Sequence, residues 1–410
     1  MNLSIFILFV ILVLIATRLV LRIKLAIWQI MLGGACAVLL TGQIEPLTAI
    51  QAINVDVMLF LFGVFVIGQA MEQSGYLTHI SYRLFARAKT IDGLLLTIIF
   101  VMGGLSAMLM NDTLAIIGTP AVLHLAKRHQ LPPKALLLCL AFAVTIGSVA
   151  SPIGNPQNLL ISLQGNISNA FIIFPKYLGI PTVINLILVY VLIKLFFKKD
   201  FHEFPLTHSH EPIADQNLAH LCKFSLIGLV ILILIKVATV YLNIFGNFKL
   251  TYIALIAAVP LLAFSPKRVN VIRRIDWHTL IFFASMFVLM KSVWDSGLLT
   301  ILIDKKSMDL YTVPSILAVS LGLSQLISNV PMVALYLPVL SESGLMENQL
   351  MALAVGSTLA GNLLIIGAAS NVIIIQKAEM SAGETLGFLE FAKIGIPLTF
   401  LNIWVYWFFI

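Results

Sequence analysis

The stretch Ser151-Pro152-Ile153-Gly154-Asn155-Pro156-Gln157-Asn158 lies inside an apolar segment of residues 135–164. A membrane-spanning helix needs about 20 apolar residues, and this segment is longer than that. Two prolines, a glycine and two asparagines near its centre predict a break in the helix. In hydrocarbon, freed backbone groups are tolerated only where they line a cavity or are buried in protein. A break at this depth therefore indicates the binding site of a transporter.

The composition places the whole chain in a lipid bilayer. Of its 410 residues, 60% are hydrophobic and 10% are charged, whereas soluble domains carry about 25% charged residues. The net charge of +7 is interpreted through the positive-inside rule, so nucleic acid is not expected as a partner. The three scattered cysteines predict neither a disulfide framework nor a metal site.

The break has a counterpart in the second half of the chain. Ile366-Gly367-Ala368-Ala369-Ser370-Asn371 aligns with residues 153–158 and keeps the Ile, the Gly and the final Asn. Other aligned pairs include Ser74-Gly75 with Ser296-Gly297, Leu105-Ser106 with Leu323-Ser324, Asn111 with Asn329, Pro120 with Pro338, and Thr145 with Thr358. The chain is therefore predicted to hold a first repeat at residues 1–199, a cytoplasmic linker at 200–220 and a second repeat at 221–410.

Hydropathy predicts ten membrane spans and two re-entrant hairpins. The spans are expected at residues 3–20, 25–43, 56–75, 135–164, 177–197, 221–243, 250–265, 277–297, 349–376 and 394–410. The apolar stretches 90–126 and 312–340 have polar centres, and the second is too short for two crossings. We expect both to be helical hairpins with their tips at Asn111-Asp112-Thr113 and Ser328-Asn329-Val330.

The distribution of charge predicts the orientation. With the N-terminus outside, the inner loops hold 19 of the 25 lysines and arginines. Each half then has five crossings and one hairpin, and because five is odd the halves are inverted. The predicted fold class is an all-α polytopic membrane protein with two inverted repeats and broken helices at 135–164 and 349–376. Both termini would lie outside a bacterial-type inner (cytoplasmic) membrane.

The hairpin tips and the breaks are expected to meet near mid-membrane and to form the transport site. The ends of half-helices attract an anion or an oxyacid, and unwound carbonyls offer oxygen ligands to Na⁺. The predicted solute-binding residues are Asn111, Thr113, Asn155, Asn158, Ser328, Asn329, Ser370 and Asn371. The predicted ligands of the coupling ion or proton are Asp112, Gly154 and Gly367.

Asp112 is the most informative single residue. A carboxylate in the middle of an apolar stretch is costly and is functional by default. It is expected either to carry a coupling proton or cation, or to cap the following half-helix, and these two roles are compatible.

The sequence contains no phosphate-binding Gly-Lys-Ser/Thr loop, no nucleophile elbow and no His-Glu-x-x-His motif. We therefore expect no enzyme activity, no ATP drive within this chain and no cofactor besides the coupling ion. Four histidines (His202, His208, His210 and His220) lie in the linker. Their irregular spacing favours a solvated linker over a metal site.

These elements resemble those of the ion transporter superfamily. Asn111-Asp112-Thr113 with Thr119-Pro120 is similar to the first-half signature of arsenite permeases. Residues 151–158 and 361–372 are similar to the two broken-helix elements found across the superfamily. This superfamily includes NhaD-type antiporters, citrate transporters and divalent anion symporters. The resemblance implies a dimerising scaffold and an elevator-like movement of the transport part.

The sequence thus predicts a secondary active transporter of a small inorganic or organic solute, an anion or an arsenite-like oxyacid, coupled to H⁺ or Na⁺. Because the carboxylate of Asp112 would repel a dianion, a proton-linked mechanism or a neutral substrate fits better. Two alternatives stay open, a Na⁺/H⁺ antiporter without an anionic substrate and a di- or tricarboxylate transporter. An ion channel with the same fold is a further possibility, which would conduct without coupling.

Overall fold

The computed structural model describes residues 3–17, 25–85, 88–165, 167, 169–198, 213–242, 249–297, 310–342, 344, 346–383 and 386–410. Within these residues the secondary structure is helical, which confirms the all-α fold class. The helices of the first half are α1 (Leu3–Thr17), α2 (Ile27–Leu40), α3 (Pro46–Ala52), α4 (Val55–Ser74), α5 (Tyr76–Phe85), α6 (Ile91–Leu109), α7 (Asn111–His129), α8 (Pro133–Val149), α9 (Pro156–Gln164) and α10 (Ala170–Phe196).

The second half repeats this order of long helices. Its helices are α11 (Gln216–Leu242), α12 (Leu250–Phe264), α13 (Arg268–Arg274), α14 (Trp277–Asp295), α16 (Val313–Ile327), α17 (Asn329–Glu342), α18 (Glu347–Leu363), the 3₁₀ turn η1 (Ile365–Gly367), α19 (Ala369–Ala382) and α20 (Phe388–Phe409). The inverted orientation of the halves stays a prediction.

The repeat in sequence is also a repeat in local geometry. Gly75 and Gly297 follow α4 and α14 with φ of 70° and 72°. Met110 and Ser328 separate the two arms of each hairpin with φ of 68° and 75°. Positive φ is uncommon outside glycine, and it occurs here at two aligned positions, as two related halves would predict.

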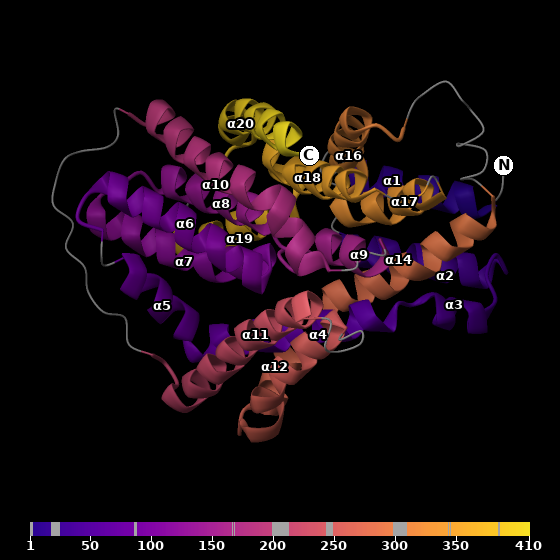
Figure 1. Ribbon diagram of the computed structural model, residues 1–410, viewed down its shortest axis with the longest axis horizontal. Helices are drawn as coiled ribbons and strands as arrows, with labels where there is room; N and C mark the ends of the chain where they lie inside the picture. The colour runs from indigo at the N-terminus through magenta and orange to yellow at the C-terminus, as the bar shows by residue number, and fades with distance from the viewer. Residues whose placement is uncertain are drawn as a thin grey trace.

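The helices gather into two groups (Figure 1). In one group α4 packs against α12, α2 against α14, and α11 against both α4 and α12. In the other, the hairpin arms α6, α7 and α16 pack with α8, α10, α18, α19 and α20. Gly147 makes the crossing of α6 and α8 close, because a Cβ atom there would lie 2.2 Å from the Gly103 carbonyl oxygen. Small residues at such crossings are typical of helix packing in membranes.

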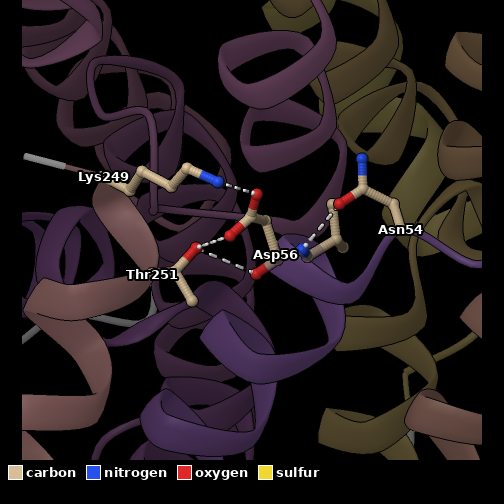
Figure 2. Close-up of polar contacts among 5 residues, drawn as sticks. Asn54, Asp56, Lys249 and Thr251 are labelled. Atoms are coloured by element: carbon tan, nitrogen blue, oxygen red, sulfur yellow. Dashed lines mark hydrogen bonds and ion pairs between the residues drawn. The ribbon is translucent and has the colours of Figure 1, made fainter. Parts of the chain in front are cut away.

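A polar contact joins the beginnings of α4 and α12 within the first group (Figure 2). The Lys249 ammonium donates a hydrogen bond of 2.9 Å to the Asp56 carboxylate, and the Thr251 hydroxyl donates one of 3.0 Å to the same group. The hydrogen bond to Asp56 raises the pKa of Lys249. Asn54 caps α4, because its side-chain oxygen accepts a hydrogen bond from the Val57 amide at 3.1 Å.

The structure differs from the sequence prediction in the short helices and in one boundary. The helices α3, α5 and α13 were not predicted, since none of them is long enough to span a membrane. α11 begins at Gln216, so the end of the predicted 200–220 linker is helical and carries His220, whereas His202, His208 and His210 lie outside the described residues. α6 is one of six described helices that are long and apolar enough to cross a membrane, although the prediction placed it in a re-entrant hairpin.

Candidate functional site

The first hairpin tip is attached to the first helix break. α6 ends at Leu109 and α7 begins at Asn111, with Met110 between them. The backbone N–H of Asn111 donates a hydrogen bond of 2.9 Å to the carbonyl oxygen of Gly154. The Asn111 side-chain oxygen accepts a hydrogen bond of 3.0 Å from the Asp112 amide in the first turn of α7, whose N-cap residue Met110 makes no side-chain cap. The structure therefore brings this predicted tip and this predicted break together.

Asp112 and Thr113 follow on the same tip, and both side chains are partly exposed. In the part of the chain that the structure describes, no hydrogen bond or ion pair engages the carboxylate of Asp112. Thr113 faces the other group of helices, because a Cβ atom on Gly68 of α4 would lie 3.0 Å from its methyl group. The tip thus lies where the two groups of helices meet.

At the first break, a side chain of α9 forms hydrogen bonds with backbone carbonyls at and just after the end of α8. α8 ends at Val149 and α9 begins at Pro156. The side-chain amide of Asn158 donates to the carbonyl oxygens of Ser148, Val149 and Ser151 at 3.1, 3.2 and 3.0 Å. These include carbonyls at the end of α8, which have no partner inside that helix.

Asn155 forms hydrogen bonds with residues of both α8 and α9 at the same break. Its side-chain oxygen accepts from the Asn158 amide at 2.8 Å, which caps α9, and its NH₂ group donates to the Ser148 hydroxyl at 2.9 Å. Asn155 and Asn158 are both fully buried. The amide groups predicted to bind solute therefore hold the two half-helices together in this structure.

Thr358 of α18 joins the first break to the second half, and it is not among the predicted site residues. Its hydroxyl accepts from Asn155 at 3.2 Å and from Gln157 at 3.4 Å, and donates to Asn158 at 3.4 Å. Its aligned partner Thr145 lies beside the second break, where its methyl group is 3.5 Å from the Cβ position of Gly361. The repetition of this threonine was the signal in the sequence.

The second break is less completely bonded. Asn371 donates to the Gly361 carbonyl at 2.6 Å, but its side-chain oxygen has no partner, and the buried hydroxyl of Ser370 has none either. The residue before α19 is Ala368, which makes no side-chain cap, whereas Asn155 caps α9. The N-terminal end of α19 therefore keeps amide groups without a side-chain acceptor.

The second hairpin meets this break through Gln325 of α16. Its side-chain NH₂ donates to the Ala360 carbonyl at 2.6 Å, while its oxygen is buried without a partner. At the tip, Asn329 is also buried with an unpartnered side-chain oxygen, and Ser328 is partly exposed. The break around Gly367 thus holds more unsatisfied polar atoms than the break around Gly154.

Gly154 and Gly367, which are predicted to bind the coupling ion, are both required by close packing. A Cβ atom on Gly154 would lie 2.3 Å from the Ser148 carbonyl oxygen, and one on Gly367 would lie 2.3 Å from the Ala360 carbonyl oxygen. Real Cβ atoms do not approach that closely, so each break requires glycine for steric reasons. The Gly154 carbonyl accepts the Asn111 hydrogen bond described above.

The comparisons with known proteins agree with this architecture. A 46 kDa membrane protein of Mycobacterium leprae (strain TN) is 27% identical over 374 residues, covering 86% of this chain and 84% of the relative. A Dictyostelium discoideum protein that carries the transporter name arsB is 22% identical over 479 residues, covering 90% of this chain and 84% of the relative. The YdaH transporter structure of Alcanivorax borkumensis has a TM-score of 0.58 at 17% identity, over 88% of this chain and 85% of that one.

These findings confirm the resemblance to the ion transporter superfamily and identify the chain as a polytopic membrane transporter. A family model described as citrate transporter matches residues 7–350, which is most of the sequence. The chain therefore belongs to the citrate transporter family.

Proposed function

We propose that this protein is a secondary active transporter that couples the movement of a small anion or an arsenite-like oxyacid to H⁺ or Na⁺. It would be a homodimer in an inner membrane, with both termini outside, and would work by elevator-type alternating access. Solute and coupling ion would share the region between the two hairpin tips and the two breaks. No enzymatic step is part of the proposal.

The observation that carries the proposal is the carboxylate of Asp112. It lies at a hairpin tip that is attached to a broken helix, and no ion pair or hydrogen bond among the described residues engages it. An unpaired carboxylate within a membrane protein is costly, so it is retained where it binds a cation or a proton. We therefore assign the coupling charge to Asp112.

The second break supplies the best groups for the solute. Ser370 and Asn371 lie in the first turn of α19, are buried, and have side-chain oxygens without partners. Amide groups at an uncapped helix N-terminus favour negative charge. α19 also packs against α7, the hairpin arm that begins next to Asp112. An oxyanion or oxyacid at the beginning of α19 would thus bind on a helix that packs against the arm carrying Asp112.

Thermal shift measurements on the purified protein test this assignment. The panel contains arsenite, antimonite, citrate, succinate, sulfate, phosphate, Na⁺ and Li⁺ at two pH values, because ligands that bind the folded state raise the melting temperature. We expect one solute to shift the wild type and Asp112→Asn to abolish that shift or its pH dependence. Asp92→Asn is the matched control on the same hairpin, since Asp92 forms a half-exposed ion pair with Lys194. If the Asp112 and Asp92 variants respond alike, the assignment is wrong.

Two alternative functions make different predictions in the same assays. The citrate transporter family supports a di- or tricarboxylate as the solute, and a citrate or succinate shift that depends on Ser370 and Asn371 would favour it. The unpaired Asp112 would by itself suffice for a Na⁺/H⁺ antiporter. Proton flux in proteoliposomes that depends on Na⁺ and needs no added anion would favour the antiporter.

A further inference from the structure

A basic cavity of about 520 Å³ lies between α5 and the beginning of α11, away from the hairpin tips and the breaks. Among the residues that the structure describes, its walls contain one arginine, one lysine and two histidines, and no aspartate or glutamate. The lining residues are Tyr76, His79, Ile80, Arg83, Ile213, Gln216, Ala219, His220 and Lys223. A cavity with this charge is suited to an anion.

The cavity lies at the ends of two apolar helices. α4 ends at Ser74, and the Ser74 carbonyl oxygen accepts hydrogen bonds from the Ala214 and Asp215 amides at 3.1 and 3.3 Å, just before α11 begins. α4 and residues 216–238 of α11 are both long and apolar enough to cross a membrane. Where such helices end, the lipid headgroups begin.

The surface next to the cavity fits an acyl chain. Below Lys223, the side chains of Phe224, Ile227, Ile231 and Leu234 are all exposed, by 65%, 44%, 49% and 61%. Residues spaced by three or four positions share one face of a helix, so these side chains form an apolar stripe down α11. The stripe begins at Phe224, next to Lys223 of the basic cavity. A charged region followed by an apolar one matches the headgroup and acyl chain of a phospholipid.

We propose that this cavity binds the phosphate headgroup of an anionic phospholipid, with one acyl chain along the exposed stripe of α11. Arg83 offers a planar fork of donors for phosphate oxygens, and Lys223 adds a compact positive charge. Basic cavities between membrane helices bind anionic headgroups by this chemistry. Because α5 packs against α4, α6 and α7, the bound lipid would contact the segment that joins the first group of helices to the first hairpin.

The test measures lipid binding to the full-length protein in detergent. Phosphatidylglycerol is compared with phosphatidylcholine of the same chains and with inorganic phosphate. The first readout is the melting temperature, and the second is native mass spectrometry, which counts retained lipids independently of stability. The variant is Arg83→Gln with Lys223→Gln. The matched control is Arg273→Gln with Arg274→Gln, which removes two exposed charges from α13, outside the cavity.

We expect phosphatidylglycerol, but neither phosphatidylcholine nor phosphate, to stabilise the wild type and the control. The cavity variant should bind phosphatidylglycerol about thirtyfold more weakly, from the typical contribution of two basic residues at an anionic surface. Equal binding by the cavity variant and the control would overturn the proposal, as would equal stabilisation by the two lipids. A shift produced equally by inorganic phosphate would identify a site for free phosphate and would also overturn the lipid assignment.

Discussion

Replacement of Asn158 by leucine separates stability from solute binding at the two breaks. Leucine has the same branched shape as asparagine and is somewhat larger, but it has no donor, so the change leaves no cavity. The amide of Asn158 has two hydrogens, which it shares among three buried carbonyls at 3.0–3.2 Å. Two net hydrogen bonds contribute about 2 kcal/mol, and the buried carbonyls that lose their donor add about 1 kcal/mol. We expect Asn158→Leu to lower the free energy of unfolding by about 3 kcal/mol.

Asn371→Leu is the matched variant at the second break. Asn371 donates one hydrogen bond, to the Gly361 carbonyl at 2.6 Å, and its side-chain oxygen has no partner to lose. The same reasoning gives a loss of about 1 kcal/mol. Equilibrium unfolding in detergent micelles, followed by tryptophan fluorescence, measures both changes. Ligand-dependent thermal shifts of the same samples then show which variant still responds to the solute.

The expected order is a larger loss of stability for Asn158→Leu and a larger loss of ligand response for Asn371→Leu. This expected order is contradicted if Asn371→Leu lowers the free energy of unfolding as much as Asn158→Leu. It is also refuted if Asn158→Leu unfolds like the wild type, because the three carbonyls at the first break would then not depend on this amide. Either result would remove the distinction between a closed first break and an open second one.

Three further predictions follow from local geometry. Gly154→Ala places a Cβ atom 2.3 Å from a backbone oxygen and should cost about 3 kcal/mol of unfolding free energy, whereas Gly33→Ala, with open space around it, should be neutral or stabilising. Ser328→Gly should stabilise the protein by about 1 kcal/mol in the same unfolding assay, and Ser328→Val should destabilise it, because φ is 75° there. The pKa of Asp215 is lowered by the hydrogen bond from the Leu218 amide and by Lys267. The ionised Asp215 therefore adds to the free energy of unfolding in full above its unfolded-state pKa of about 4, and this contribution is lost as the pH falls through the lower folded-state pKa. Asp215→Asn should therefore reduce the fall of the melting temperature at acidic pH.

The sequence predicted the long elements because apolar length is a strong signal. Among the described residues, the ten predicted spans and both predicted hairpins correspond to helices. Each break falls where Gly and Asn interrupt an apolar run, together with Pro in the first break and Ser in the second. The helix α5 was missed because its ten residues are amphipathic and include polar positions such as His79 and Arg83. A hydropathy reading finds segments that span the bilayer, and a short helix at its surface does not have that signal.

The candidate site was predicted less completely because one residue type serves two purposes. An asparagine in a helix break can bind a solute or can cap the broken ends, and the sequence spacing is the same for both. In the first break the carbonyls at the end of α8 lie within 3.2 Å of the side-chain amide nitrogen of Asn158. The NH₂ group of Asn158 therefore donates its hydrogen bonds to the end of α8 and not to a solute. Which carbonyls come within reach depends on the path of the chain between Ala150 and Asn155, and periodicity does not determine that path.

The difference between the breaks lies at one aligned position. Asn155 precedes α9 and caps it, while Ala368 precedes α19 and cannot. In a capped half-helix, a side chain of the same protein accepts a hydrogen bond from an N-terminal amide group. In an uncapped half-helix, these amide groups can donate to a ligand. Two halves with related sequences therefore need not contribute equally to a site. In the proposed site the first half would contribute the carboxylate of Asp112, and the second half would contribute a helix terminus with Ser370 and Asn371. Such a site would hold a coupling cation and an oxyacid at once.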